Sequence, residues 1–329
     1  MKWTKTLSNI NSLQTDKLPV IFLLGPTASG KTDWAIAWQK EFTDIEIISV
    51  DSVMVYKGCD IGSAKPSPEI LANHPHHLVD QTTLNNIFSV ADFYELAHNL
   101  ISDIHKRHKI PLLVGGSMMY FNVLKNGIYS LPAANKAFRE MLKRRIRLEG
   151  IETLHAELYA LNPESARKIK PQDTQRLIRA LEIQHLLPNT IETSVVAKTS
   201  LQLNRDYHLY EYGIFPQDRS ILHARIEERQ RSLVQAGLLQ EAKNLVETYN
   251  LVPDHPAMKA VNYRQALQVL NGQIKESDLF EKSLFATRQL AKRQCTWMRS
   301  WKNLKSFDLV DRNKASKHLK KHLNLHKII

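Results

Sequence analysis

An eight-residue phosphate-binding motif follows the first strongly apolar segment of the chain. It matches the pattern GxxxxGK[ST] and stands between the apolar run 19–24 (PVIFLL) and a predicted helix that begins at Lys31. Backbone N–H groups of such a loop and of the helix N-terminus can surround a phosphate, while the lysine neutralises its charge and the Thr32 hydroxyl can reach a magnesium ion. The motif predicts a phosphate site without identifying the compound. The predicted binding residues are Gly25, Pro26, Thr27, Ala28, Ser29, Gly30, Lys31 and Thr32.

Polar residues close two further apolar segments. The run 45–50 stops at Asp51, and the run 111–114 stops at two glycines followed by Ser117. A carboxylate facing a phosphate loop can hold magnesium through water or accept a proton from a nucleophile, although Asp51 also suits a turn or helix cap. Paired glycines let the backbone approach a ligand closely, and a plain tight turn explains them equally well.

Basic residues offer further contacts with anions. Arg225 and Arg229 stand four apart on a predicted helix, where they could clamp phosphate oxygens or form solvated ion pairs with neighbouring glutamates. Over 136–147, six basic residues accompany a single Glu140, which suits an RNA backbone contact or a solvated helix face. The 329-residue chain has 45 Lys+Arg against 33 Asp+Glu, and its net charge of +12 attracts polyanions or simply aids solubility.

The elements that must position these residues indicate an α/β fold. The three apolar runs are typical of buried parallel strands, and the stretch 91–104 between the second and third has helical spacing. Strands separated by helical crossovers predict a doubly wound parallel sheet. Because ligands bind beyond the carboxyl ends of such strands, we expect the Gly25 loop, Asp51 and Ser117 to converge on one crevice.

A change in composition divides the chain. From about residue 130 to 205, helix formers replace strand patterns, and strand-like alternation returns at 207–215. Leu290, Trp297 and Trp301 have the spacing of core residues on a late helix, which favours a core position over base stacking. The predicted organisation is an α/β core of residues 1–129 and 206–310, a helical insertion of residues 130–205 and a polar, basic tail of residues 311–329.

Composition also restricts the compartment. Two cysteines without a CxxC spacing support neither a disulfide framework nor a zinc site, which indicates a reducing environment. The first 17 residues lack the apolar stretch of a signal peptide, and no segment approaches the roughly 20 apolar residues of a membrane span. We therefore expect a cytoplasmic protein without a membrane partner. We also expect a monomer.

Five ordered segments between about residues 19 and 302 closely resemble the tRNA dimethylallyltransferase (tRNA isopentenyltransferase) family, in its bacterial form without a zinc-finger extension. Only the first of them is widely shared with other phosphate-binding proteins. The segments are 25–32 (GPTASGKT), 51–66 (DSVMVYKGCDIGSAKP), 115–120 (GGSMMY), 171–182 (PQDTQRLIRALE) and 286–299 (ATRQLAKRQCTWMR).

The resemblance implies a P-loop-type fold and the transfer of a dimethylallyl group from its diphosphate to N6 of adenosine at tRNA position 37, with Mg²⁺. The partners would be dimethylallyl diphosphate and the tRNA anticodon stem-loop, so the phosphate loop would hold a diphosphate rather than ATP. By similarity, Asp51 accepts the proton of the adenine amine. Ser117 takes the place of a catalytic Thr beside the diphosphate bridge, and Arg225 stabilises the leaving group.

The same resemblance assigns the RNA contacts, with Arg139 on the basic run of the insertion and Thr32 as the magnesium ligand. The tRNA-binding residues it implies are Asp51, Ser52, Val53, Met54, Ser117, Arg139, Gln175, Arg176, Leu177, Ile178, Arg179, Lys259, Ala260, Val261, Asn262, Tyr263 and Arg264.

The chain departs from the family pattern at several positions. Ser63 and Ser117 stand where the family has Thr, and both keep a hydroxyl. Residues 187–189 (LPN) replace a common Ser-Gly-Lys, and Asn262 replaces a Gly. Since a glycine there commonly signals positive φ and Asn tolerates the left-handed region, we predict positive φ at Asn262.

Two other classes compete with this interpretation. In a P-loop kinase of a nucleoside or small alcohol, Asp51 would be the base and Arg225 with Arg229 a lid, but such an enzyme does not need a long basic insertion. A noncatalytic RNA-binding GTPase-like switch would carry an NKxD-type guanine motif, which the sequence lacks.

Overall fold

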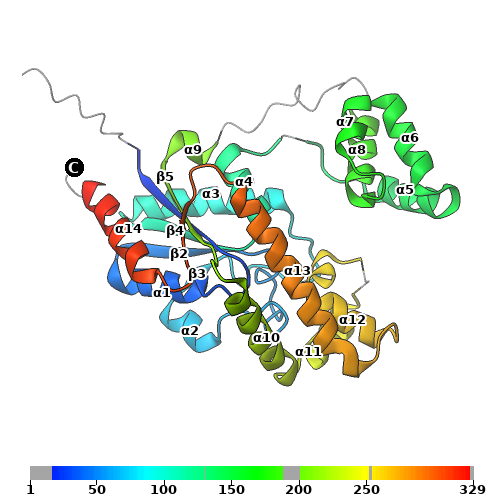
Figure 1. The fold of residues 1–329 in the computed structure, drawn as a ribbon. Helices are drawn as coiled ribbons and strands as arrows, with labels where there is room; N and C mark the ends of the chain where they lie inside the picture. Colours follow the sequence, from blue (N-terminus) through cyan, green and yellow to red (C-terminus); the bar gives the residue numbers. More distant parts are fainter. Residues whose placement is uncertain (1–16, 130, 188–200, 252–253, 327–329) are drawn as a thin grey trace, which may run out of the picture. The chain divides into compact units, whose positions relative to one another are not determined.

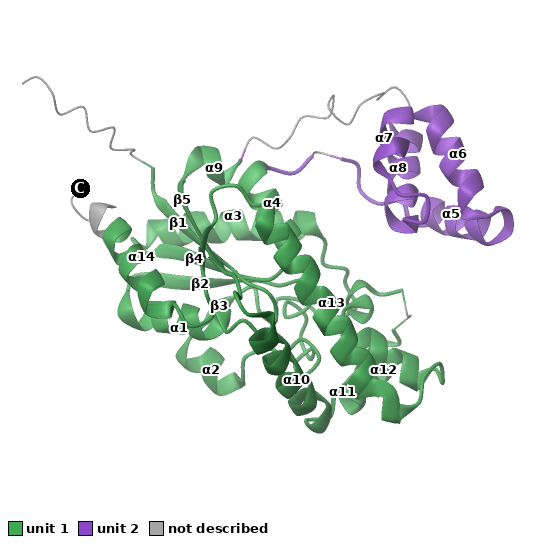
Figure 2. Ribbon diagram, viewed as in Figure 1, with its two compact units in different colours: residues 1–126, 202–329 green, residues 127–201 purple. Residues whose placement is uncertain are grey.

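The chain forms two compact units, coloured separately in Figure 2. The computed structural model describes residues 17–129, 131–187, 201–251 and 254–326. Unit 1 comprises 1–126 with 202–329, and unit 2 comprises 127–201. The second unit thus begins and ends within four residues of the helical insertion expected over 130–205. Positions 188 and 189 of the departure at 187–189 lie outside the described residues.

Unit 1 is built on a six-stranded, all-parallel sheet of order β3-β2-β4-β1-β5-β6 (Figure 1). This confirms the doubly wound parallel α/β class. The apolar runs form the three strands predicted for them, and the two short edge strands β3 and β6 were not predicted. The strands are β1 (Pro19–Leu24), β2 (Ile45–Val50), β3 (His76–His77), β4 (Ile110–Gly115), β5 (His208–Ile214) and β6 (Lys305–Phe307).

Helices connect and cover these strands. The predicted helix over 91–104 is present as α3, which begins with a reciprocal cap between Ser89 and Asp92 and buries a stripe that includes Phe93 and Ile101. None of the described helices is long and apolar enough to cross a membrane. The helices of unit 1 are α1 (Lys31–Glu41), α2 (Pro68–Asn73), α3 (Val90–Lys106), α4 (Met118–Asn126), α9 (Leu203–Asp206), α10 (Arg219–Gln235), α11 (Leu238–Tyr249), α12 (Tyr263–Leu270), α13 (Leu279–Arg299) and α14 (Arg312–His326).

The segment expected to be a polar tail is a packed helix, α14. Ala315, Leu319 and Leu323 recur every four residues, so they form one apolar stripe that is buried in the same core as α1 and the sheet. Trp38 Nε1 also donates a hydrogen bond to Ser316 Oγ at 2.9 Å. The lysines that suggested a tail occupy the opposite, solvated side. The prediction of a tail was wrong because charge masked the four-residue period.

Unit 2 consists of α5 (Lys136–Glu149), α6 (Ile151–Leu161), α7 (Pro163–Lys168) and α8 (Thr174–Leu186), packed around a separate hydrophobic core. Leu177 and Ile178 belong to that core, with exposed fractions of 0% and 6%. Their side chains therefore stabilise the packing of α8. The prediction that these two side chains contact tRNA was wrong, because they are buried. Gln175 and Arg176 are exposed on the same helix.

A buried carboxylate organises the basic helix of unit 2. Glu182 is fully buried, and its oxygens accept hydrogen bonds from Arg139, Arg179 and the N–H of Asn135. These bonds lower the pKa of Glu182 against the effect of burial. Arg139 and Arg179, both predicted as RNA contacts, thus have structural partners inside the unit, which the sequence pattern did not indicate.

Candidate functional site

The carboxyl ends of β1, β2 and β4 meet at one point, as the sequence analysis predicted. Gly115 at the end of β4 is in register with Leu24 of β1 on one side and with Val50 of β2 on the other. The N–H of Gly25 donates to Gly115 O at 3.2 Å, and the N–H of Ser117 donates to Val50 O at 3.4 Å. The phosphate loop, Asp51 and Ser117 are therefore brought together by the sheet itself.

The paired glycines satisfy packing constraints. A Cβ at Gly115 would lie 2.1 Å from Val50 O, and a Cβ at Gly116 would lie 2.4 Å from the side-chain nitrogen of Gln294. The first approach is to backbone, which cannot yield. The sequence analysis offered close approach to a ligand or a plain tight turn. The structure shows a different role, in which the missing side chains allow the ends of β2 and β4 and helix α13 to pack closely together.

A cavity of about 790 Å³ opens at this junction. Ser52, Val53 and Met54 line it beside Asp51, and α10 and α13 supply part of its wall. Of the predicted phosphate-loop residues, Gly25, Pro26 and Ser29 lie behind the wall. The remaining predicted site residues in the lining are Thr27, Ala28, Gly30, Lys31, Thr32, Ser117, Arg225, Lys259, Ala260, Val261, Asn262 and Arg264.

The phosphate loop leaves its helix end available to an anion. Gly30 has φ of 83° and precedes α1 without any side-chain cap, so the first N–H groups of α1 have no intrahelical acceptor. The Nζ of Lys31 reaches back to Pro26 O at 3.3 Å. Uncapped N–H groups beside a lysine form the cradle expected for a phosphate group.

Positive charge is concentrated in this cavity. Burial, then repulsion from Arg229, lowers the pKa of Lys31 to about 8, against the attraction of Asp51. Burial also lowers the pKa of Arg229, whose guanidinium donates to Ala64 O at 3.1 Å. Arg225 Nη1 would be 3.7 Å from a Cβ placed on Gly30, so it adjoins the phosphate loop. Asp33 and Asp51 are the two carboxylates of the same lining. The crowding of three cations beside the phosphate loop favours a multiply charged anion.

Asp51 caps a turn, one of the roles considered from sequence, and it also lines the cavity. Its Oδ1 accepts hydrogen bonds from the N–H groups of Val53 at 2.8 Å and Met54 at 3.2 Å, which closes a turn after β2. The carboxylate nevertheless lines the cavity. The turn fixes one oxygen, so the second oxygen can address a ligand in a defined direction.

Comparison with known proteins decides the family. The family model for IPP transferase matches residues 54–301. The chain belongs to the IPP transferase family. The tRNA dimethylallyltransferase of Nitrosomonas eutropha is 41% identical over 301 residues, which are 92% of this chain and 94% of that protein. That of Thiobacillus denitrificans is 44% identical over 292 residues, 89% of this chain and 92% of that protein.

A solved structure agrees with this assignment. The full-length tRNA isopentenylpyrophosphate transferase of Bacillus halodurans matches with a TM-score of 0.67 and 32% sequence identity, covering 94% of this chain and 98% of that chain. The family model covers the cavity-lining residues from Met54 to Gln294, whereas the phosphate loop and Asp51 precede its match.

Gln294 is a site residue that the sequence analysis missed. Its Oε1 accepts from the N–H of Thr27 at 2.9 Å, and its Nε2 donates to Gly116 O at 3.0 Å, so one α13 side chain joins the phosphate loop to the end of β4. The available signal was a polar residue on the apolar face of a helix, in line with Thr287 and Leu290.

The tryptophans of the last long helix were only partly understood. Leu290 lines the cavity, and Trp301 is half-buried with its Nε1 bonded to Glu211 at 2.5 Å. Trp297, expected in the core, is 44% exposed. The buried face of α13 at this point is formed by Gln294, Cys295 and Met298, so Trp297 lies outside that face.

Two residues that depart from the family pattern, Ser63 and Asn262, form specific hydrogen bonds with the backbone. Ser63 Oγ donates to Cys59 O at 2.6 Å, so its hydroxyl braces the chain after Asp51. Asn262 has the predicted positive φ, at 78°, but its ψ of −58° is that of a γ-turn rather than the left-handed helical region. Its Nδ2 donates to Gly62 O at 2.8 Å.

Tyr263 differs from the other members of the predicted RNA-contacting segment 259–264. It is fully buried and donates to Glu241 Oε1 at 2.6 Å. Its side chain therefore cannot contact RNA directly, and that part of the prediction is corrected. Its neighbours in the segment line the cavity.

We expect Asn262→Val to impair the enzyme more than Asn262→Gly. Valine is strained at positive φ by about 1–3 kcal/mol and also loses the bond to Gly62. Glycine accepts the conformation and loses only that bond, about 0.5–1.5 kcal/mol. Thermal unfolding and tRNA affinity should rank wild type, Gly, Val in that order, with diphosphate affinity least affected. Equal behaviour of Val and Asn would contradict the role of the backbone conformation.

Proposed function

We propose that this protein transfers the dimethylallyl group of dimethylallyl diphosphate to N6 of adenosine 37 of tRNA, beside the anticodon, and acts as a cytoplasmic monomer. The observation that carries the proposal is a single cavity in which Asp51 faces the same space as Lys31, Arg225 and Arg229. A cationic cradle suits a diphosphate leaving group, and a carboxylate at the end of β2 suits the removal of one proton.

In the proposed reaction, these residues account for the bond that forms, the bond that breaks and the proton that is released. The adenine N6 attacks C1 of the dimethylallyl group, the C1–O bond breaks, and the electron pair leaves with diphosphate. The N6 proton passes to the free oxygen of Asp51. Lys31, Arg225 and the N–H groups of α1 offset the charge that develops on the diphosphate, and Ser117 stands near the bridging oxygen. The base must leave the RNA stack to reach the cavity.

The donor set suits magnesium. Among the described residues no cluster of three or more His, Cys, Asp or Glu side chains forms a metal cage. Thr32 and Asp51, one hydroxyl and one carboxylate, line the cavity together. Mg²⁺ commonly keeps several waters and binds through few protein ligands plus substrate phosphates, so these residues fit it. The ion would neutralise diphosphate charge when bound.

A P-loop kinase is not favoured. The chain's relatives at 41% and 44% identity over about nine-tenths of its length are tRNA dimethylallyltransferases. The direct test incubates the protein with dimethylallyl diphosphate, Mg²⁺ and unmodified tRNA, and then analyses nucleosides by mass spectrometry. An adenosine that gains a prenyl group at position 37 supports the proposal. Phosphate transfer from ATP without prenylation would replace it with the kinase.

Unit 2 is proposed to bind the anticodon stem-loop through exposed basic residues of α5. Lys136, Arg144 and Arg147 are exposed and carry no ion pair to another residue of the described chain, whereas Arg139 is held by Glu182. Replacing these three by Ala should weaken tRNA binding and reduce the slope of log K against log salt by about 2–3, because each phosphate contact releases counterions.

A matched control removes the same charge elsewhere. Lys314, Lys317 and Lys320 of α14 are exposed in unit 1, and their replacement by Ala lowers the net charge equally. The α14 variant should leave the salt slope nearly unchanged. Equal effects of both triple variants would mean that overall charge, and not α5, attracts the RNA.

A further inference from the structure

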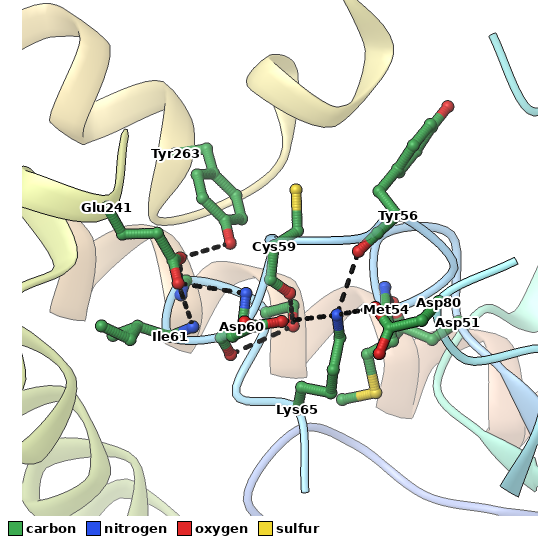
Figure 3. A network of polar contacts seen from close by, with 12 residues as sticks. Asp51, Met54, Tyr56, Cys59, Asp60, Ile61, Lys65, Asp80, Glu241 and Tyr263 are labelled. Atoms are coloured by element: carbon green, nitrogen blue, oxygen red, sulfur yellow. Dashed lines mark hydrogen bonds and ion pairs between the residues drawn. The ribbon is translucent and has the colours of Figure 1, made fainter. Parts of the chain in front are cut away.

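A carboxylate behind the cavity holds one of its walls. Glu241 on α11 accepts four hydrogen bonds, and Figure 3 shows it beside Asp60, Ile61 and Tyr263. Its Oε2 accepts from the N–H groups of Asp60 at 3.1 Å and Ile61 at 2.7 Å, and its Oε1 accepts from the N–H of Gly62 at 2.9 Å and the hydroxyl of Tyr263 at 2.6 Å. Successive N–H groups that converge on an anion form a nest. The carboxylate therefore sets the conformation of the chain at 60–62.

The chain held by this nest continues into the cavity. Gly62, Ser63, Ala64 and Pro66 line the cavity, and we call residues 60–66 the 60–66 loop. Its Ala64 O accepts the hydrogen bond from Arg229, one of the cations that face the substrate. A loosened nest would consequently displace the wall that orients Arg229.

The fourth bond of Glu241 leads to a different wall. Tyr263 belongs to the segment 259–264, whose other residues line the same cavity. Its ring packs so closely on Gly62 that a Cβ there would lie 2.5 Å from Cζ. Burial raises the pKa of Tyr263, so the hydroxyl keeps its proton and donates to Glu241. One carboxylate thus joins the diphosphate side of the cavity to the segment that the family resemblance assigns to RNA.

We propose that Glu241 is a positioning residue that couples the binding of the diphosphate substrate to the binding of tRNA. When RNA binds and orders the segment 259–264, Tyr263 and Glu241 also order the 60–66 loop. The diphosphate then binds to a site that has already lost its conformational entropy, so it binds more tightly. The coupling is reciprocal. That the RNA is tRNA rests on the proposed function. The four hydrogen bonds of Glu241 are independent of that function.

Glutamine cannot replace Glu241. Each carboxylate oxygen serves two donors, and a carboxamide has only one oxygen, so in either orientation two donors face an NH₂ group. Glu241→Gln should therefore release either Asp60 and Ile61, or Gly62 together with a reversal of the Tyr263 bond, in which the hydroxyl accepts from the NH₂ group. Tyr263→Phe is milder, because it removes only the bond of Glu241 to the second wall and keeps both the nest and the hydrogen bond from Asn262 to Gly62 O.

The experiment measures the Kd of dimethylallyl S-thiolodiphosphate, an analogue without the labile C–O bond, in the absence and presence of saturating anticodon stem-loop RNA with Mg²⁺. The ratio of the two Kd values is the coupling factor. For the wild-type enzyme we expect a factor of about 5 or more. Glu241→Gln should bring it towards 1, and Tyr263→Phe should lower it with little change in the Kd without RNA. The control is Glu247→Gln, on the same helix with a 63% exposed side chain, which should keep the wild-type factor.

Each outcome bears on the proposal. A wild-type factor near 1, or a Glu241→Gln variant that loses both affinities while the factor stays unchanged, would overturn it and leave Glu241 a merely structural residue. If Glu241→Gln does not fold, Tyr263→Phe decides the question in the same way. Failure of the proposed function would be seen separately, as wild-type protein that does not prenylate tRNA.

Discussion

Asp51→Asn should reduce the rate of prenyl transfer by roughly 10²–10⁴-fold while the affinity for dimethylallyl diphosphate stays within about threefold of wild type, because a general base acts on the transition state and contributes little to ground-state binding. Asparagine preserves the oxygen that accepts from Val53 and Met54, so the turn after β2 remains closed. Single-turnover measurements with saturating tRNA separate the chemical step from binding.

Asp51→Ala is the informative comparison. It should show the same loss of turnover and, in addition, a lower thermal stability, because the N–H groups of Val53 and Met54 lose their acceptor. Each lost hydrogen bond should lower the free energy of unfolding by about 0.5–1.5 kcal/mol, or by more because the acceptor is charged. A stability loss in Ala but not in Asn would separate the turn from the chemistry. Wild-type turnover in the Asn variant would remove Asp51 from the mechanism.

The part of the site that could be predicted depends on strand ends. The three apolar runs predict β1, β2 and β4, and parallel strands bring their carboxyl ends to one edge of the sheet. The sequence alone was therefore enough to place the Gly25 loop, Asp51 and Ser117 together, as the strand pairing confirms. The positive φ of Asn262 was predictable for a similar reason, since it depends on one residue type and its local backbone.

Other features depend on contacts between distant segments. Gln294 meets Thr27 across 267 residues and Glu241 meets Asp60 across 181, and no local pattern announces either bond. Arg139 illustrates the opposite error. Its position in a basic run suggested RNA, while its partner Glu182 lies 43 residues away and fully buried. Charge runs reveal charge, but only the fold shows which cations are already paired.

Lys31→Ala should weaken diphosphate binding by roughly 10–100-fold, the effect of losing a hydrogen bond between two charged groups. Turnover at saturating substrate should fall less than affinity, provided that Arg225 and the α1 N–H groups still hold the leaving group. Calorimetric titration with inorganic diphosphate and Mg²⁺ measures the change. An unchanged affinity would mean that Lys31 does not anchor the phosphate.

The pH dependence gives the sharper test of Lys31. In the free protein its pKa is lowered to about 8 by burial and by Arg229. A bound anion favours the protonated amine, so the pKa in the complex must be higher, and binding takes up a proton between the two values. Affinity should therefore be constant below about pH 8 and fall above it, by up to about tenfold per pH unit. The Lys31→Ala profile records the ligand's own titration, and subtracting it from the wild-type profile isolates the lysine. If the two profiles ran parallel above pH 8, the lysine would not be titrating at the site. Its charge would then be fixed by Asp51 despite the burial.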